Sequence, residues 1–231
     1  MTTYHSAKKD IFINVPVEKV WKALTVPSQR NKWETKQCEI NLAIGGKIDL
    51  DYGWGVTYSG IITEIKENEK LVIEGSDKGL TIWTITPQDG GSLVSIEYTG
   101  LWSDDIGIME MENMMFGTYQ FMKNFKSVLE KNIDIRHTFW ASWIGVLHRT
   151  HPSKSGVEVV KIISHTPADG IIQVGDIIQS LNGQTIHNYD DFETQITQMG
   201  PDKEITLDIQ RQNHHCTINI TTIPYGTKLQ H

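Results

Sequence analysis

The sequence predicts an α+β protein, in which an antiparallel sheet wraps around a long helix and a small β-rich domain follows. Three observations lead to this prediction. Short stretches rich in isoleucine, valine and threonine recur between residues 47 and 99, at a spacing typical of antiparallel strands. Residues 109–131 carry apolar side chains at steps of three and four, the period of one helix face. A new series of alternating apolar stretches begins after residue 142.

The bulk properties indicate a globular chain of one or two domains. It has 231 residues, of which 39% are hydrophobic and 21% charged, enough for a sizeable core. The net charge of −7 argues against a nucleic-acid partner. No apolar run approaches the ~20 residues that a membrane span needs, and residues 1–10 lack the apolar core of a secretory signal. We therefore expect a cytoplasmic protein without a membrane partner, whose Cys38 and Cys216 are reduced thiols.

The first part of the chain has the pattern of a strand, two short helices and a meander. Apolar and polar residues alternate over residues 10–15, which predicts the first strand. Pro16 suits the first turn of a helix, and Pro27 begins a second, shorter one. Five strands are expected next, at about residues 47–52, 56–65, 70–74, 81–86 and 93–99.

The helix at residues 109–131 is expected to close this sheet. Its apolar face consists of Met111, Met115 (or Met114), Thr118, Met122, Phe125 and Leu129. Two interpretations of the methionines remain open. A stripe of this kind is most often core, but the flexible, polarizable side chain of methionine also suits a pocket for variable ligands. Five of the seven methionines lie between Met109 and Met122, which favours a pocket wall.

Several segments of this part carry a family resemblance. They are "VPVEKVWKALTVPSQRNKW", "IGGKI", "YSGIITEIKENEKLVIE", "GGSLVSIEYTG" and "FKSVLEK". In this order, over about residues 6–131, they resemble the START-like SRPBCC helix-grip superfamily, and within it the heat-shock-ATPase-activator homologues. The resemblance implies a cavity between sheet and helix that binds an apolar small molecule or a protein client. The residues expected at this cavity are Tyr52, Trp54, Trp83, Tyr98, Met111, Met115 and Met122.

The second part of the chain has the pattern of a small β-rich domain. Valine and isoleucine alternate over residues 157–163, which predicts a strand. Asn182-Gly183 is a strong hairpin turn. Asn188 is placed to cap a helix whose apolar face includes Phe192 and Ile196. Two alternating strands, near residues 205–209 and 216–220, complete the pattern.

This second part resembles a PDZ domain. The segments "WIGV", "TPADG" and "VGDIIQSLNG", followed by a helix, are similar to PDZ modules of bacterial proteases of the high-temperature-requirement kind. The resemblance implies that a peptide adds as a strand to a sheet edge and that backbone N–H groups capture its terminal carboxylate. The residues expected to bind the peptide are Trp143, Ile144, Gly145, Val146, Phe192 and Ile196. We therefore expect a helix-grip domain over residues 1–135 and a PDZ domain over residues 136–231, with its core at 142–224.

These patterns favour a non-enzymatic, chaperone-like adaptor with two partners. One is an apolar small molecule or client in the helix-grip cavity, and the other is the C-terminal peptide of a partner protein. Two alternatives remain: a hydrolase or stress-response enzyme acting in the helix-grip cavity, and a purely structural module with a filled core. An inward-facing desolvated carboxylate or histidine near the cavity would favour the enzyme. The sequence has no Cys-x-x-Cys, phosphate-binding glycine loop or His-Glu-x-x-His, so no catalytic residue, cofactor or metal is predicted.

Overall fold

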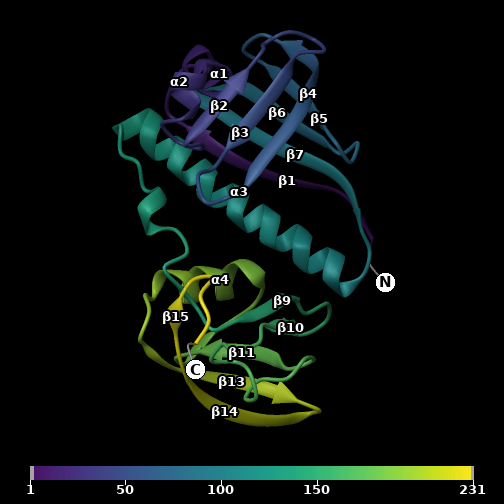
Figure 1. Ribbon diagram of the computed structural model, residues 1–231, viewed down its shortest axis with the longest axis vertical. Coiled ribbons are helices and arrows are strands. Elements are labelled where there is room, and N and C mark those ends of the chain that lie inside the picture. Colours follow the sequence, from purple (N-terminus) through teal and green to yellow (C-terminus); the bar gives the residue numbers. More distant parts are fainter. Residues whose placement is uncertain (1–2, 230–231) are drawn as a thin grey trace. The chain divides into compact units, whose positions relative to one another are not determined.

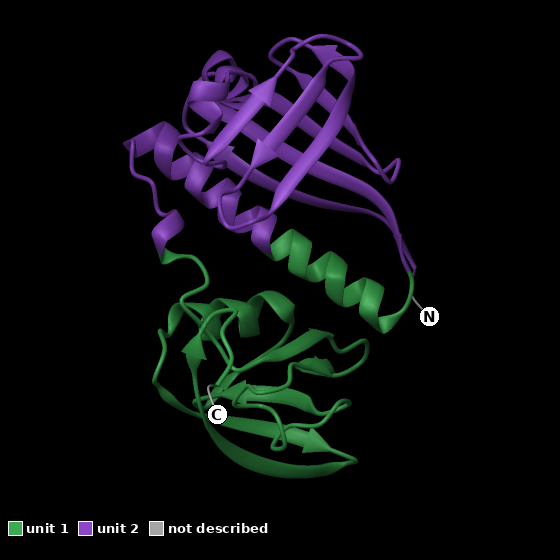
Figure 2. Cartoon of the chain, in the orientation of Figure 1, with its two compact units in different colours: residues 1–2, 103–116, 138–231 green, residues 3–102, 117–137 purple. Residues whose placement is uncertain are grey.

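The computed structural model describes residues 3–229, which form two compact units (Figure 2). Unit 1 contains residues 103–116 and 138–229, and unit 2 contains residues 3–102 and 117–137. The long helix α3, Asp105–Lys131, is therefore shared by both units. The units differ from the predicted ranges 1–135 and 136–231 at residues 136–137, which belong to unit 2, and at residues 103–116, because the first half of α3 packs with the C-terminal part of the chain. No helix of the described residues is long and apolar enough to cross a membrane.

Unit 2 is built on an antiparallel sheet with the strand order β1-β7-β6-β5-β4-β3-β2 (Figure 1). Its strands are β1 Tyr4–Ile13, β2 Gln37–Ile40, β3 Lys47–Asp51, β4 Thr57–Lys66, β5 Lys70–Gly75, β6 Leu80–Gln88 and β7 Gly91–Trp102. Two short helices, α1 Val17–Thr25 and α2 Pro27–Arg30, connect β1 to β2. The meander from β2 to β7 follows the chain, and β1 pairs antiparallel with β7. With the helix α3 on this sheet and a β-rich C-terminal part, the predicted fold class is confirmed.

The core of unit 2 lies between the sheet, α1 and residues 117–131 of α3. Trp33 stacks on Phe125 with a ring separation of 4.1 Å and meets Trp83 edge-on at 6.2 Å. Asn124, which is buried, donates from Nδ2 to the Trp33 carbonyl at 2.7 Å. Aromatic stacking and a satisfied buried amide together hold the segment after α2 against the helix.

Unit 1 contains a sheet with the strand order β14-β13-β11-β10-β9, in which β12 also pairs with β11, and a small β15-β8 pair. Its strands are β8 Ser142–Trp143, β9 Val146–Thr150, β10 Val157–Ile162, β11 Ile177–Leu181, β12 Gln184–Thr185, β13 Glu204–Arg211, β14 His214–Thr221 and β15 Ile223–Pro224. A 3₁₀ turn, Arg136–Thr138, precedes β8. Helix α4, Tyr189–Gln198, is capped by Asn188, whose side chain accepts from the Asp191 N–H at 3.0 Å. Strand β9 ends this sheet, and α4 packs beside it.

Candidate functional site

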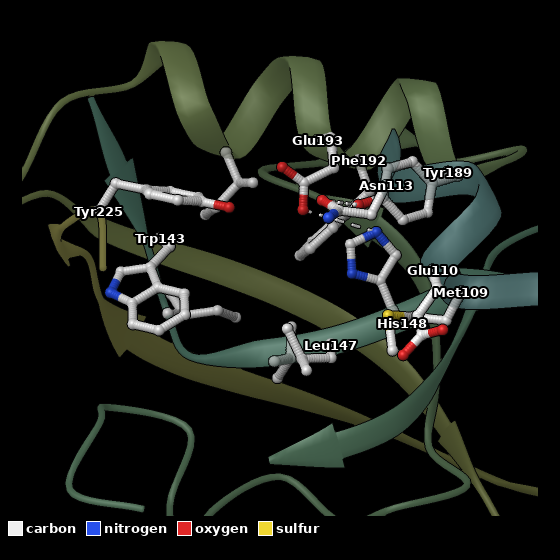
Figure 3. A pocket seen from close by; sticks show the side chains of 13 residues that line it. Met109, Glu110, Asn113, Trp143, Leu147, His148, Tyr189, Phe192, Glu193 and Tyr225 are labelled. Carbon is white, nitrogen blue, oxygen red and sulfur yellow. Dashed lines mark hydrogen bonds and ion pairs between the residues drawn. The ribbon is translucent and has the colours of Figure 1, made fainter. Parts of the chain in front are cut away.

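A pocket of about 260 Å³ lies within unit 1, between strand β9 and helix α4 (Figure 3). Its walls are mostly apolar and aromatic, with a few polar groups, which is the usual composition of a ligand site. The first half of α3, the β8–β9 segment, α4 and the residue after β15 all contribute. The lining residues are Met109, Glu110, Asn113, Trp143, Ile144, Val146, Leu147, His148, Tyr189, Phe192, Glu193, Ile196 and Tyr225.

One end of the pocket is formed by the turn at Gly145. This residue has a φ of +87°, and a Cβ there would lie 2.0 Å from Oγ1 of Thr166. The Ile144 carbonyl accepts from the Ala168 N–H at 3.0 Å, and the Gly145 carbonyl accepts from the Ile163 N–H at 2.9 Å. In a trans peptide unit the N–H points opposite to the C=O. The N–H groups of Gly145 and Val146 therefore both face away from residues 163–168, as successive donors of an anion-binding nest do.

The strand that follows this turn, β9, has a free edge. It pairs with β10 on one side and is the last strand of its sheet. The Thr150 N–H donates to Oε2 of Glu112 at 2.7 Å instead of to β10. In an antiparallel ladder the backbone groups of alternate residues point to the same side. The N–H and C=O groups of Val146 and His148 therefore face the same open edge as Thr150 and are placed to pair with an added strand.

Two titratable side chains lie at the floor of the pocket. His148 is 1% exposed, and its ring lies 4.5 Å from that of Tyr189 and 4.8 Å from that of Phe192. Its Nε2 lies 3.9 Å from Oε1 of Glu193, which descends from α4 (Figure 3). Burial lowers the pKa of His148 to about 3 and raises the pKa of Glu193 to about 7. Around neutral pH the imidazole is therefore uncharged, and Glu193 is poised between its neutral and ionised forms.

Some polar atoms at the floor of this pocket make no hydrogen bond within the described residues. Within residues 3–229, neither ring nitrogen of His148 has a hydrogen-bond partner. Tyr225 covers the pocket beside Trp143, with a ring separation of 5.3 Å, and burial raises the pKa of its hydroxyl to about 12. A ligand that offers a hydrogen-bonding group to His148 would satisfy a buried polar side chain that now lacks a partner.

The first half of α3 forms the other end of the pocket. Oδ1 of Asn113 accepts from the Tyr189 hydroxyl at 3.1 Å, and the ring of Phe116 lies 6.1 Å from that of Tyr189. Asp105 pairs with Nε of Arg149 at 3.0 Å. Burial raises the pKa of Glu112, although its bonds to Thr150 oppose this shift. These contacts fix residues 105–116 against β9 and the start of α4.

The structure brings the predicted peptide-binding residues together in this pocket. Trp143, Ile144, Val146, Phe192 and Ile196 line it, and Gly145 makes the turn at its end. Sequence reasoning missed His148, Glu193 and Tyr225, and also the residues of α3. The sequence could have indicated His148, because a residue two positions after Val146 lies on the same face of the strand. The contribution of α3 has no local signal, because its apolar face gives no indication of which unit it contacts.

The residues predicted for a helix-grip cavity do not gather in one place. Trp83 and Met122 are buried in the core of unit 2, where Tyr52 and Tyr98 are partly buried. Met111 and Met115 are buried but belong to the part of α3 in unit 1. Trp54 is 56% exposed and stacks on Phe121 at 6.2 Å. It lies between Gly53 and Gly55, both at positive φ, so the turn carries its side chain out of the core.

Unit 2 contains a buried carboxylate, but it is paired. Arg30 and Glu34 are 1% and 7% exposed, and Nε of Arg30 donates to Oε2 of Glu34 at 2.5 Å. Arg30 also donates to the Leu24 carbonyl at 3.0 Å, and the Tyr52 hydroxyl donates to Oε1 of Glu34 at 3.4 Å. Burial, followed by the charge of Glu34, raises the pKa of Tyr52. This arrangement anchors α2 to the core.

Comparisons with known proteins agree with this architecture. Residues 14–130 match the family model described as Activator of Hsp90 ATPase homolog 1-like protein, and residues 143–222 match the PDZ domain model. No curated protein matches the chain.

Among solved structures, a Staphylococcus saprophyticus protein is 16% identical with a TM-score of 0.50, and the match covers 57% of this chain and 96% of that one. A Staphylococcus aureus protein of unknown function is 13% identical with a TM-score of 0.50, over 57% and 96% of the two chains. The AHSA1-like protein from Aeromonas hydrophila is 19% identical with a TM-score of 0.48, over 55% and 93%. The family model spans just over half of the 231 residues. The chain therefore belongs to the Activator of Hsp90 ATPase homolog 1-like protein family and carries a PDZ domain after the family's helix-grip fold.

Proposed function

We propose that this protein is a non-enzymatic adaptor whose PDZ domain holds the C-terminal residues of a partner protein. The observation that supports the proposal most strongly is the Gly145 turn, which turns the N–H groups of Gly145 and Val146 away from residues 163–168 at the end of the free β9 edge. A peptide carboxylate binds these donors, and the peptide backbone pairs with Val146 and His148. The last side chain of the peptide enters the apolar space beside Phe192 and Ile196.

Amidating the terminus of a bound peptide is expected to weaken its binding about tenfold or more. A charge-assisted hydrogen bond contributes ~1.5–3 kcal/mol, and the amide lacks the charge that the nest recognises. Titration calorimetry with paired free-acid and amidated peptides ending in valine measures this difference, against an expected micromolar affinity, about −8 kcal/mol, for the free acid. Equal binding of the two forms would mean that the groove binds a segment inside the partner's chain and not its C-terminus. No binding of either would contradict the proposal.

The affinity for a free C-terminus is expected to fall about fivefold as the pH rises from about 6 to about 8. The raised pKa of Glu193, about 7, means that its carboxyl is neutral at the lower pH and repels a bound carboxylate at the higher one. Burial lowers the pKa of His148 to about 3, below this window, and raises the pKa of Tyr189 and Tyr225 further above the ordinary tyrosine value, which already lies above the window. The Glu193→Gln variant should show a flat profile, whereas Glu204→Gln on β13 should keep the slope. A slope that survives Glu193→Gln would assign the pH dependence elsewhere.

The raised pKa of Glu193 also predicts how the stability of the fold depends on pH. The folded state binds the Glu193 proton more tightly than the unfolded chain, so the free energy of unfolding decreases as pH rises from ~4.3 through ~7. The peptide affinity and the free energy of unfolding are therefore both expected to decrease as pH rises, and the Glu193→Gln variant should remove both pH dependences.

A second binding function, for an apolar molecule or client, is proposed for unit 2. It is supported by a cluster of aromatic side chains, Tyr52, Trp54 and Phe121, in which Trp54 is 56% exposed and stacks on the partly buried Phe121. Exposed apolar groups of this kind mark interaction sites. Trp54→Ala should lower the affinity for an apolar fluorescent probe by about fivefold or more. Ile44→Ala removes another exposed apolar side chain, at 73% exposure, and should leave probe binding unchanged. Equal effects would contradict this site.

The enzyme alternative receives less support, because the buried carboxylate of unit 2, Glu34, is neutralised by Arg30. A cytoplasmic setting fits the two free thiols, Cys38 and Cys216.

A further inference from the structure

We propose that strand β14 of the PDZ domain pairs with β14 of a second copy of this chain, in an antiparallel arrangement with two-fold symmetry centred on Ile218. The inference concerns the residues of unit 1 alone and does not depend on the proposed peptide binding. Strand β9 lies at the other end of the strand order, so this pairing leaves the β9 edge of each copy open.

Strand β14 is a sheet edge that lacks the usual protection against pairing. Among the described strands it pairs only with β13. Its eight residues follow β13 without a register shift and include no Lys, Arg, Asp, Glu or Pro. Natural edge strands are usually short, bulged, charged or interrupted by proline, because these features prevent pairing with another chain. The edge strand β2 of unit 2, by contrast, has only four residues and contains Glu39. The β14 edge is therefore suited to accept a strand.

Hydrogen bonds around the β13–β14 pair show which backbone groups face outward. The Thr222 N–H donates to the Lys203 carbonyl at 2.9 Å, so Thr222 faces β13. The Thr206 carbonyl accepts from the Asn182 N–H at 2.8 Å, on the side of β11. Asn219, which lies opposite Thr206, therefore belongs to a pair without backbone hydrogen bonds. By alternation, the N–H and C=O groups that point away from β13 belong to four exposed residues, His215, Thr217, Asn219 and Thr221.

A two-fold register centred on Ile218 uses all four of these residues. It places Thr217 opposite Asn219 of the second copy, and His215 opposite Thr221 of the second copy. Moving the centre by one or two residues leaves at least one outward-facing residue without a partner on β14. Neither opposite pair joins two side chains that can both carry a charge, so no like charges are brought together.

The other face of the strand is also self-complementary in this register. Ile218 lies opposite its own copy, and Cys216 lies opposite Ile220 of the second copy. Ile220 is buried and Ile218 is partly buried against the core of the PDZ domain, whereas Cys216 is exposed. Pairs without backbone hydrogen bonds bring their side chains closest together. The pairing therefore extends the apolar face of the sheet across the two-fold axis, which favours a second copy over an unrelated strand.

Sedimentation equilibrium of the full chain tests the association. The mass should rise from 26.2 kDa toward twice this value between about 1 and 300 µM, the range of a small, transient interface. Asn219→Pro removes an outward N–H and no bond to β13, and should weaken association about tenfold. Asn219→Ala keeps that N–H and should change association less than about threefold. A monomer at every concentration, or equal association of the two variants, would overturn the proposal.

A cysteine pair tests the register without relying on proline. Ile218→Cys and Thr217→Cys are each combined with Cys216→Ser and oxidised with glutathione. At position 218 the two Cα atoms would lie about 4.5 Å apart, within the range of about 4.4–6.8 Å that a disulfide spans. Thr217 lies on the opposite face and is not opposite its own copy. Non-reducing electrophoresis should show at least about fivefold more linked dimer for Ile218→Cys. Equal yields, or no linked dimer for Ile218→Cys, would contradict this arrangement.

Discussion

Replacing Gly145 with alanine is expected to abolish peptide binding and to destabilise the PDZ domain by about 2–5 kcal/mol. Two costs add. The backbone at φ +87° is strained for a residue with a Cβ, and that Cβ would lie 2.0 Å from Oγ1 and 2.3 Å from Cβ of Thr166. Relieving the clash must move the turn, and with it the N–H groups of Gly145 and Val146. Urea unfolding followed by amide signals of the PDZ domain measures the loss.

Gly175 provides a matched control for this substitution. Its φ is +89°, but a Cβ there would have no neighbour within 4 Å. Gly175→Ala should therefore cost only the backbone strain, ~1–2 kcal/mol, and should leave peptide affinity unchanged. If the two alanine variants lost the same stability and both still bound peptide, the close approach of Gly145 to Thr166 would have no role in the site.

Replacing Arg30 with leucine is expected to destabilise unit 2 by ~3–5 kcal/mol, because it leaves the carboxylate of Glu34 buried and unpaired. The Leu24 carbonyl would also lose its donor, which now lies at 3.0 Å. The readout is denaturant unfolding followed by the fluorescence of the buried Trp33 and Trp83.

The double variant Arg30→Leu/Glu34→Leu separates charge from packing. Removing both charges replaces a buried ion pair by apolar side chains, which is often close to neutral, so most of the stability should return. The remaining loss would come from the Leu24 carbonyl, which would still lack its donor, and from the Tyr52 hydroxyl, which would lack its acceptor. A double variant as unstable as the single one would show that Arg30 acts through its packing on Trp33, whose ring lies 5.8 Å from the guanidinium.

Local chemistry explains which elements could be predicted from the sequence. Asn182-Gly183 forms the expected turn, with φ values of +50° and +77°, and Asn188 caps α4 as predicted. Both depend on residues that are close in sequence. The sequence does not predict strand β2, Gln37–Ile40, because its alternation of polar and apolar residues is only four residues long and the strand depends on its pairing with β3. The predicted start of the long helix at Met109 is four residues late, since the first turn from Asp105 contains a glycine, and its two isoleucines, two residues apart, do not follow the helical period.

The residues of the candidate site could likewise be predicted only where they belong to local motifs. The Gly145 turn and the apolar face of α4 follow from short motifs. The side chains that give this groove its individual character come from distant segments: Glu112 lies 38 residues before Thr150, and Asn113 lies 76 residues before Tyr189. The ionisation of Glu193 depends on burial beneath several elements, which no local pattern encodes. Trp54 was expected in a cavity but is exposed, because two flanking glycines at positive φ direct its turn outward.

The most direct measurement of the central claim follows the backbone amides of Gly145 and Val146 by NMR during peptide titration. If a peptide carboxylate binds the nest, both amide protons should shift strongly downfield with the free-acid peptide and much less with its amidated form, because an ionised acceptor makes the stronger hydrogen bond. The amide of Gly175, outside the groove, should not move. Shifts of Gly145 and Val146 that are the same for both peptides, or no shift at saturating free-acid peptide, would contradict the account.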